Sequence, residues 1–277
     1  MRKIITYTIG ADPELFIVNE KTKKVVSSIG LIPGEKGNPY VGEDMPSGFG
    51  LETDNILAEF NIPPSTDQIS FINNIEYMKN YIDRFVKDKN PELGIKCAAS
   101  MKVDPDQLNS PEARLFGCDP DYNVYTECMN PKPEGERTNL RSAGFHIHFG
   151  YPNFNTESSL RMVKYFDLYL GLPSVLLDKD TQRRKLYGKA GSFRLCSYGF
   201  EYRTLSSAMM ADRDKLRTIW SGIEKAVFAF NRGVSLPESG YVRKAINEND
   251  IDLAKALIKK YNVLNTEDLC AESSDTL

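Results

Sequence analysis

The chain contains two histidines, His146 and His148, which stand two positions apart. The residues that alternate with them are all apolar: Phe145, Ile147 and Phe149. Side chains two positions apart on a β-strand point to the same face of a sheet. The pattern therefore predicts a strand over 143–149 with one imidazole-bearing face and one apolar face. Any mechanism that needs three histidines is excluded.

Polar pairs on one strand face recur elsewhere in the chain. The further pairs are Glu59 with Asn61 and Glu201 with Arg203, and Glu14 stands where a strand resumes after Pro13, with Asp12 two residues earlier. The solvated face of an antiparallel sheet also alternates polar and apolar residues. Such a face usually mixes Lys, Thr, Ser and Glu, however, and rarely holds every histidine of a chain. We therefore interpret these pairs as the floor of a functional site.

The local patterns predict an α+β protein with a largely antiparallel sheet. Expected strands cover residues 3–9, 14–18, 25–29, 56–62, 94–101, 143–149 and 199–205. Expected helices cover about 65–87, 157–171 and 212–230, with two or three short helices between 241 and 269. We expect residues 10–13 (Gly-Ala-Asp-Pro) to form a turn, and Pro63-Pro64 to end a strand. The strands and helices do not alternate regularly, which disfavours a doubly wound fold.

Composition narrows the classes of function. The chain has 35 basic and 38 acidic residues, a net charge of −3, so nucleic acid is disfavoured as the main partner. We find no apolar run long enough to span a membrane and no signal peptide, so no membrane partner is expected. Five cysteines without a CxxC pair indicate reduced thiols and a cytoplasmic location.

A cluster of cations lies between residues 183 and 203. Its basic members are Arg183, Arg184, Lys185, Lys189, Arg194 and Arg203, with Glu201 as the one acid among them. Glycines at 188, 191 and 199 would let a ligand approach the backbone, and arginine binds phosphate with two parallel hydrogen bonds. The cluster favours an anionic ligand, although a solvated basic loop gives the same pattern. Neither a Walker A sequence nor a GxGxxG motif is present.

Carboxylates that converge from several strands suit a hard divalent cation. Magnesium prefers oxygen ligands and often binds together with a substrate phosphate. Zinc held by His146, His148 and one of the three strand glutamates is the alternative, and it would make the protein a hydrolase. That alternative has no need of the cationic segment.

Several motifs occur here in an order that resembles one family. They are residues 10–14, 34–36, 54–62, 116–123, 143–150, 170–174 and 183–206. Over about residues 9–230 the chain resembles the phage-encoded carboxylate–amine ligases (amidoligases, type 2), relatives of glutamine synthetase and glutamate–cysteine ligase. Phe145 and Cys196 depart from the pattern, which has glycine and lysine at these two places.

The resemblance implies a fold, a reaction and a cofactor. The fold would be an antiparallel sheet forming a funnel or half-barrel flanked by helices, over 1–235, with a helical C-terminal extension over 236–277. The reaction would be ATP-dependent amide formation between a carboxylate and an amine through an acyl phosphate, with Mg²⁺ or alternatively Mn²⁺. The substrates would be small molecules, peptides or protein groups. A homo-oligomer is compatible with the resemblance, because related synthetases often assemble, and the location would be the host cytoplasm if the protein is phage-encoded.

The resemblance also implies roles for individual residues. The expected metal ligands are Glu14, Glu59 and Glu201. The expected nucleotide-binding residues are His146, His148, Lys36, Arg184, Lys189 and Arg194. Arg194 and Arg203 would stabilise charge during phosphoryl transfer, and Asp54 would serve as the general base. A nucleotide-binding module without catalysis remains an alternative on the same fold.

Overall fold

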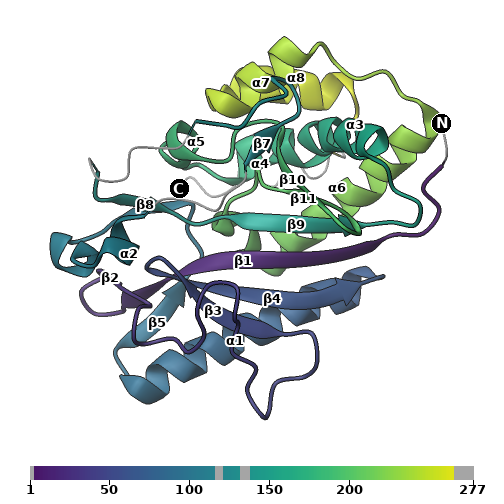
Figure 1. Cartoon of the computed structure of the whole chain (residues 1–277). Coiled ribbons are helices and arrows are strands. Elements are labelled where there is room, and N and C mark those ends of the chain that lie inside the picture. The colour runs from purple at the N-terminus through teal and green to yellow at the C-terminus, as the bar shows by residue number, and fades with distance from the viewer. Residues whose placement is uncertain (1–2, 116–120, 132–137, 265–277) are drawn as a thin grey trace.

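The computed structural model of the protein describes residues 3–115, 121–131 and 138–264. Its main sheet has the strand order β3-β4-β1-β9-β11-β10-β7, and β2 and β5 also pair with β1 (Figure 1). The strands of this sheet are β1 Thr8–Asn19, β2 Val25–Val26, β3 Gly50–Asp54, β4 Leu57–Ser65, β5 Leu93–Lys96, β7 Tyr122–Asn123, β9 Phe145–Gly150, β10 Ser192–Cys196 and β11 Gly199–Tyr202. A two-stranded sheet pairs β6 Ser100–Lys102 with β8 Leu140–Ser142.

Every strand pair in the described part of the chain is antiparallel, and the main sheet stays open rather than closing into a barrel. The prediction of an α+β fold with an antiparallel sheet flanked by helices is thus confirmed. The longer helices are α1 Gln68–Lys89, α3 Thr156–Phe166, α6 Arg213–Arg232, α7 Ser239–Asn247 and α8 Ile251–Lys260. The shorter ones are η1 Pro105–Leu108, α2 Pro111–Arg114, the π-helical η3 Asp167–Gly171, α4 Leu172–Leu177, α5 Arg183–Leu186 and η4 Ser207–Met210.

The expected turn at residues 10–13 is wrong, because β1 runs through it without a break. Asp12 and Pro13 lie opposite His146 and Phe145 of β9. Pro13 has no N–H to donate, but the next amide, that of Glu14, donates to the carbonyl of Gly144 at 3.0 Å. Pairing with β9 and β4 on either side thus overrides local turn signals. The strand β4 likewise continues through Pro63-Pro64 to Ser65 instead of ending before them.

One face of the main sheet packs on helices and forms the core. The side chains of Phe145, Ile147 and Phe149 are fully buried there, as the sequence predicts. The ring of Phe166 in α3 packs edge-on against Phe149, with 5.3 Å between ring centroids. Helices α1 and α6 meet over the same core through Phe71 and Trp220, whose centroids are 5.6 Å apart. No helix of the described residues is long and apolar enough to cross a membrane.

The opposite face of the sheet carries the polar pairs, and it is buried too. Asp12, Glu14, Glu59 and His146 are each 6–8% exposed, and Glu201 is fully buried. Residues from the β3–β4 turn, from 141–144 and from 183–188 lie around this face. A solvated sheet face would leave these side chains in water, so the structure contradicts that interpretation of the alternating pattern.

Candidate functional site

The register of the strands aligns the polar residues in two cross-strand rows. In one row Glu201 of β11 lies between His148 of β9 and Arg194 of β10. In the next row Asp12 of β1 lies opposite His146 of β9. Directly opposed residues of an antiparallel pair share a face, so all five side chains point into the same space.

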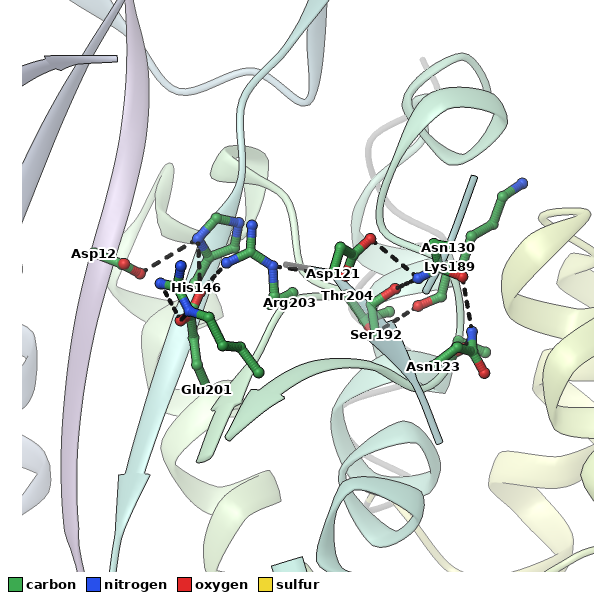
Figure 2. Close-up of polar contacts among 12 residues, drawn as sticks. Asp12, Asp121, Asn123, Asn130, His146, Lys189, Ser192, Glu201, Arg203 and Thr204 are labelled. Carbon is green, nitrogen blue, oxygen red and sulfur yellow. Dashed lines mark hydrogen bonds and ion pairs between the residues drawn. The ribbon is translucent and has the colours of Figure 1, made fainter. Parts of the chain in front are cut away.

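Glu201 is held by two arginines (Figure 2). Its Oε2 accepts from Nε of Arg194 at 2.6 Å and lies 2.5 Å from Nη2 of the same residue. Its Oε1 accepts from Nη1 of Arg203. The Nε of Arg203 lies 3.6 Å from Asp121, so this guanidinium links two carboxylates. Because Glu201 and Arg203 are both at most 5% exposed, this is a charge-balanced cluster inside the protein.

The two imidazoles share a carboxylate but occupy different positions. Nδ1 of His146 lies 3.4 Å from both Asp12 and Glu201, and Nε2 of His148 lies 3.0 Å from Asp12. The other ring nitrogen of His148 contacts the hydroxyl of Tyr198. Burial alone would raise the pKa of Asp12, but the two imidazoles hold it well below its usual value. Burial would lower the pKa of His148, and the Asp12 carboxylate instead raises it.

Gly144 determines where the ring of His146 can lie. A Cβ at position 144 would stand 2.5 Å from Nε2 of His146, which is closer than real Cβ contacts allow. The amide of Gly144 also donates to Oε2 of Glu14 at 2.6 Å. Gly144 thus connects the imidazole row to a second group of acids.

That second group consists of Glu14, Asp54 and Glu59. One carboxylate oxygen from each lies within 4.8 Å of the others, and all three residues are buried. Glu14 of β1 is directly opposite Glu59 of β4, and Asp54 ends the neighbouring strand β3. Burial, together with repulsion from Asp54, raises the pKa of Glu14. A buried set of oxygen donors with this mutual repulsion fits a divalent cation, and oxygen is the donor that Mg²⁺ prefers.

A pocket opens beside this acidic group. Its empty space is about 560 Å³ when the part open to solvent is included. Glu14 and Asp54 line one part of it, while Arg141, Arg183 and Arg203 line another. Burial lowers the pKa of Arg183 to about 10, which leaves this buried guanidinium positively charged at neutral pH. The pocket therefore brings a candidate cation site next to fixed positive charges.

The structure places the three glutamates that are expected to bind metal in two separate groups. Glu14 and Glu59 belong together, and Asp54 joins them instead of Glu201. Glu201 falls in another group, with Asp12 and His146. Both oxygens of Glu201 already bind guanidinium groups, which makes this second group a poorer cation site. Neither group includes His148, so the described residues do not form the alternative zinc site of His146, His148 and a glutamate.

The expected nucleotide-binding cations are distributed over three places. Arg194 lies on Glu201, and Lys36 reaches from the 30–49 loop to Asp54, with its Nζ 2.8 and 2.9 Å from the two carboxylate oxygens. Arg184 lies outside the pocket lining, where it donates to Ser174 at 2.8 Å. Lys189 offers its carbonyl oxygen to Thr204, and its side chain extends away from the Glu201 cluster (Figure 2).

The sequence patterns did not identify three residues that belong to the site, namely Asp12, Arg183 and Asp121. Asp12 was visible as the same-face partner of Glu14, but the predicted turn removed it from the strand. Arg183 belonged to the cationic cluster, without a signal to separate it from its neighbours. Asp121 belongs to motif 116–123, of which residues 116–120 lie outside the described residues.

The comparisons with solved structures find distant similarity. The bifunctional glutathione synthetase from Pasteurella multocida aligns with 93% of this chain at 11% identity and a TM-score of 0.45, over 47% of its own chain. The chain thus spans about half the length of that enzyme. A GmaS/ADP complex aligns with 98% of this chain and 73% of its own at 11% identity, with a TM-score of 0.39.

The comparison with family models gives a specific result. No curated protein matches the sequence. The model of the phage phiEco32-like COOH-NH2 ligases of type 2 matches residues 136–229, about a third of the chain. This range holds β9, β10 and β11, and with them both histidines, Arg194, Glu201 and Arg203. Over residues 136–229 the chain is therefore similar to the phage phiEco32-like COOH-NH2 ligases of type 2.

Proposed function

We propose that the protein is an ATP-dependent ligase that joins a carboxylate to an amine through an acyl phosphate. The observation that carries the proposal is the pocket beside the buried group of three carboxylates, two of which line it together with buried arginines. A carboxylate substrate and the phosphates of ATP are anions, so both need a cation and positive side chains nearby. The match to the COOH-NH2 ligase family supports the same reaction.

Glu14, Asp54 and Glu59 would hold the metal, which we propose to be Mg²⁺ or alternatively Mn²⁺. When bound, the metal supplies a Lewis acid that offsets negative charge on phosphate oxygens. The amide of Gly144 fixes the carboxylate of Glu14 by donating to it at 2.6 Å. Lys36 orients Asp54 and connects the 30–49 loop to the acidic group. Asp54 thus fits a metal ligand better than the general base, and its role as a base stays a prediction.

Arg203 and Arg183 would bind the negative charge of the substrates. Both line the pocket, and Arg203 is oriented by its hydrogen bond to Glu201. In this proposal Glu201 acts on the arginines Arg194 and Arg203 rather than as a ligand of the same metal as Glu14. A guanidinium fixed in advance needs little reorganisation when charge develops on a transferring phosphoryl group.

His146 would orient groups at the centre of the site. It lies between Asp12 and Glu201, and it also lines the pocket.

We propose that the ligase domain covers residues 1–235. We also propose that the protein acts in the cytoplasm, which would be that of the host cell if the protein is phage-encoded.

The proposal is tested by nucleotide binding and by turnover. ATP should bind in calorimetry with Mg²⁺ or Mn²⁺ present and bind far more weakly in EDTA, because the buried acids repel a bare triphosphate. Phosphate release should then depend on both a carboxylate and an amine in a screen of amino acids and peptides. Equal ATP affinity in EDTA would count against the proposal. One tightly held zinc per chain in metal analysis would favour the hydrolase instead.

A further inference from the structure

The α7–α8 turn, defined as residues 247–250 with Asn247 as the last residue of α7, contacts the cationic segment through two asparagines. The amide of Ala190 donates to Oδ1 of Asn247 at 2.8 Å. Nη1 of Arg184 donates to Oδ1 of Asn249 at 2.7 Å. Both asparagines lie beyond residue 229, where the match to the ligase family ends. A part of the chain outside that match therefore bonds directly to the segment that leads into β10.

Arg184 depends on this turn for a hydrogen-bond acceptor because its side chain is buried. It is 4% exposed, and burial lowers the pKa of its guanidinium. Its guanidinium donates hydrogen bonds to Asn249 and, at 2.8 Å, to the hydroxyl of Ser174. A buried guanidinium that loses an acceptor is strongly destabilised in that position. Asn249 therefore helps to hold Arg184, and with it the start of the cationic segment, in place.

The segment held in this way borders the pocket. Arg183, next to Arg184, lines the pocket and donates to the carbonyl of Thr204 at 2.9 Å. Gly188 has a φ of 70°, and a Cβ there would stand 1.8 Å from Nη1 of Arg183. The backbone at 188 and the Arg183 guanidinium are thus in direct contact. A displacement of the segment at Arg184 or Ala190 would move Arg183 relative to the acidic group.

A third contact joins α7 to the same segment through an aromatic ring. The guanidinium of Arg243 lies 5.8 Å from the centroid of the Tyr125 ring. That ring packs against Gly191, where a Cβ would stand 2.7 Å from Cδ2 of Tyr125. Gly191 directly precedes β10, which carries Arg194. The α7 helix therefore contacts the end of the loop that leads into β10, directly at Ala190 and through Tyr125 at Gly191, while Asn249 beyond α7 contacts Arg184 in α5.

The turn itself is firmly packed, so it can act as an anchor. Ile246 of α7 packs on Gly171, where a Cβ would stand 2.6 Å from its Cδ1. Asn249 adopts a left-handed conformation, with φ 54°, which asparagine tolerates better than most residues. The side chain of Asp250 then caps α8 by accepting from the amide of Leu253 at 3.0 Å.

We propose that the α7–α8 turn is a positioning element for the anion-binding side of the pocket. Asn247 and Asn249 are positioning residues that act through Ala190 and Arg184, and neither touches substrate. The expected effect of these asparagines on ATP binding rests on the proposed function. Their expected effect on the cationic segment rests on the hydrogen bonds alone. The C-terminal helices are then part of the working site rather than an independent extension.

The test compares two disruptive variants with matched rescues. Asn247→Ala removes the acceptor for Ala190, and Asn249→Gly removes the acceptor for Arg184 while keeping a residue suited to positive φ. Asn247→Asp and Asn249→Asp restore an oxygen acceptor at each place. Glu248→Ala is the control, since this exposed residue lies between the two asparagines in the same turn. Each full-length variant is measured by amide exchange over 183–194, by calorimetry with Mg-ATP and by thermal melting.

We expect the Ala190 amide to exchange about tenfold faster in Asn247→Ala. Mg-ATP should bind at least fivefold more weakly to Asn247→Ala and Asn249→Gly, with the aspartate variants restoring both properties and Glu248→Ala unchanged. Amide exchange over 183–194 that stays unchanged in both disruptive variants would overturn the inference. Faster amide exchange in these variants together with full affinity for Mg-ATP would also overturn it. If the wild-type protein binds no Mg-ATP, the proposed function fails, and exchange with its aspartate rescue still decides whether the turn positions the segment.

Discussion

The imidazole of His146 lies directly over Gly144, and no side chain fits between them. A Cβ at position 144 would be 2.5 Å from Nε2 of His146 and 3.1 Å from its Cδ2. The same glycine donates its amide to Glu14. One residue without a side chain therefore sets the spacing between the imidazole row and the acidic group.

Gly144→Ala should displace His146 and disturb Glu14 together. We expect Mg-ATP to bind at least about tenfold more weakly, a change of about 1.4 kcal/mol. Overpacking should lower the free energy of unfolding by about 1–3 kcal/mol. Calorimetry and urea denaturation measure the two effects. Gly240→Ala is the control because its Cβ would come no closer than 4.0 Å to another atom, and a variant at 144 that binds Mg-ATP normally would contradict the assignment of this site.

Glu59→Gln should abolish the stabilisation that a divalent cation gives. In the wild-type protein Mn²⁺ should raise the melting temperature because it binds the folded state alone. Without metal the variant should melt at or above the wild-type temperature, since it removes one of three crowded carboxylates. Melting curves in EDTA and in Mn²⁺ test both points, with the exposed residue Glu112→Gln as the control. A full Mn²⁺ response in Glu59→Gln would show that the metal binds elsewhere.

Arg203→Ala and Arg194→Ala should differ in stability although both contact Glu201. Arg203 is 5% exposed, and its loss leaves Oε1 of Glu201 and Oδ1 of Asp121 without their buried guanidinium partner, which should cost roughly 3–5 kcal/mol. The Arg194 side chain is 27% exposed, so water can replace it and the cost should be roughly 1–2 kcal/mol. Urea denaturation compares the two variants. Equal losses would mean that burial does not set the strength of these ion pairs.

The two faces of β9 should respond differently to substitution. Ile147→Ala opens a cavity in the core and should destabilise the protein by about 2–5 kcal/mol. His148→Asn keeps a polar group beside Asp12, so its cost should stay below about 2 kcal/mol, while ATP consumption with the true substrates should fall sharply. Thermal melts and phosphate release separate these effects. If the Asn variants at 146 and 148 are stable and fully active, the imidazole row has no role in the reaction.

Asp167 should make stability depend on pH. Burial raises its pKa to about 6, although the hydroxyl of Tyr202 donates to it at 2.7 Å. The folded state therefore holds a proton that the unfolded state releases near pH 4, and stability should fall as pH rises from about 4 to 6. The loss approaches roughly 3 kcal/mol above pH 6. Asp167→Asn should flatten this slope in melts between pH 4.5 and 7.5, and an unchanged slope would assign it to another group.

Local periodicity was enough to predict the faces of β9, because alternation depends only on neighbours in sequence. It failed at Gly10 to Pro13, where local turn signals lost to pairing with two long-range partners. Which acids lie together also could not be predicted from the sequence. Whether Glu201 joins Glu14 or Asp12 depends on the register between β1, β9 and β11, and single-strand patterns contain no information on that register.

The position of β1 determines the order in which the site can form during synthesis. β1 can pair with β2, β4 and β5 as soon as residue 96 has left the ribosome, but its other edge waits for β9, about 50 residues later. Until then the buried carboxylate of Asp12 has no imidazole partner and an edge of β1 stays open to other chains. A nascent chain stalled near residue 140 should therefore be a target for chaperones, and release should follow translation of β9.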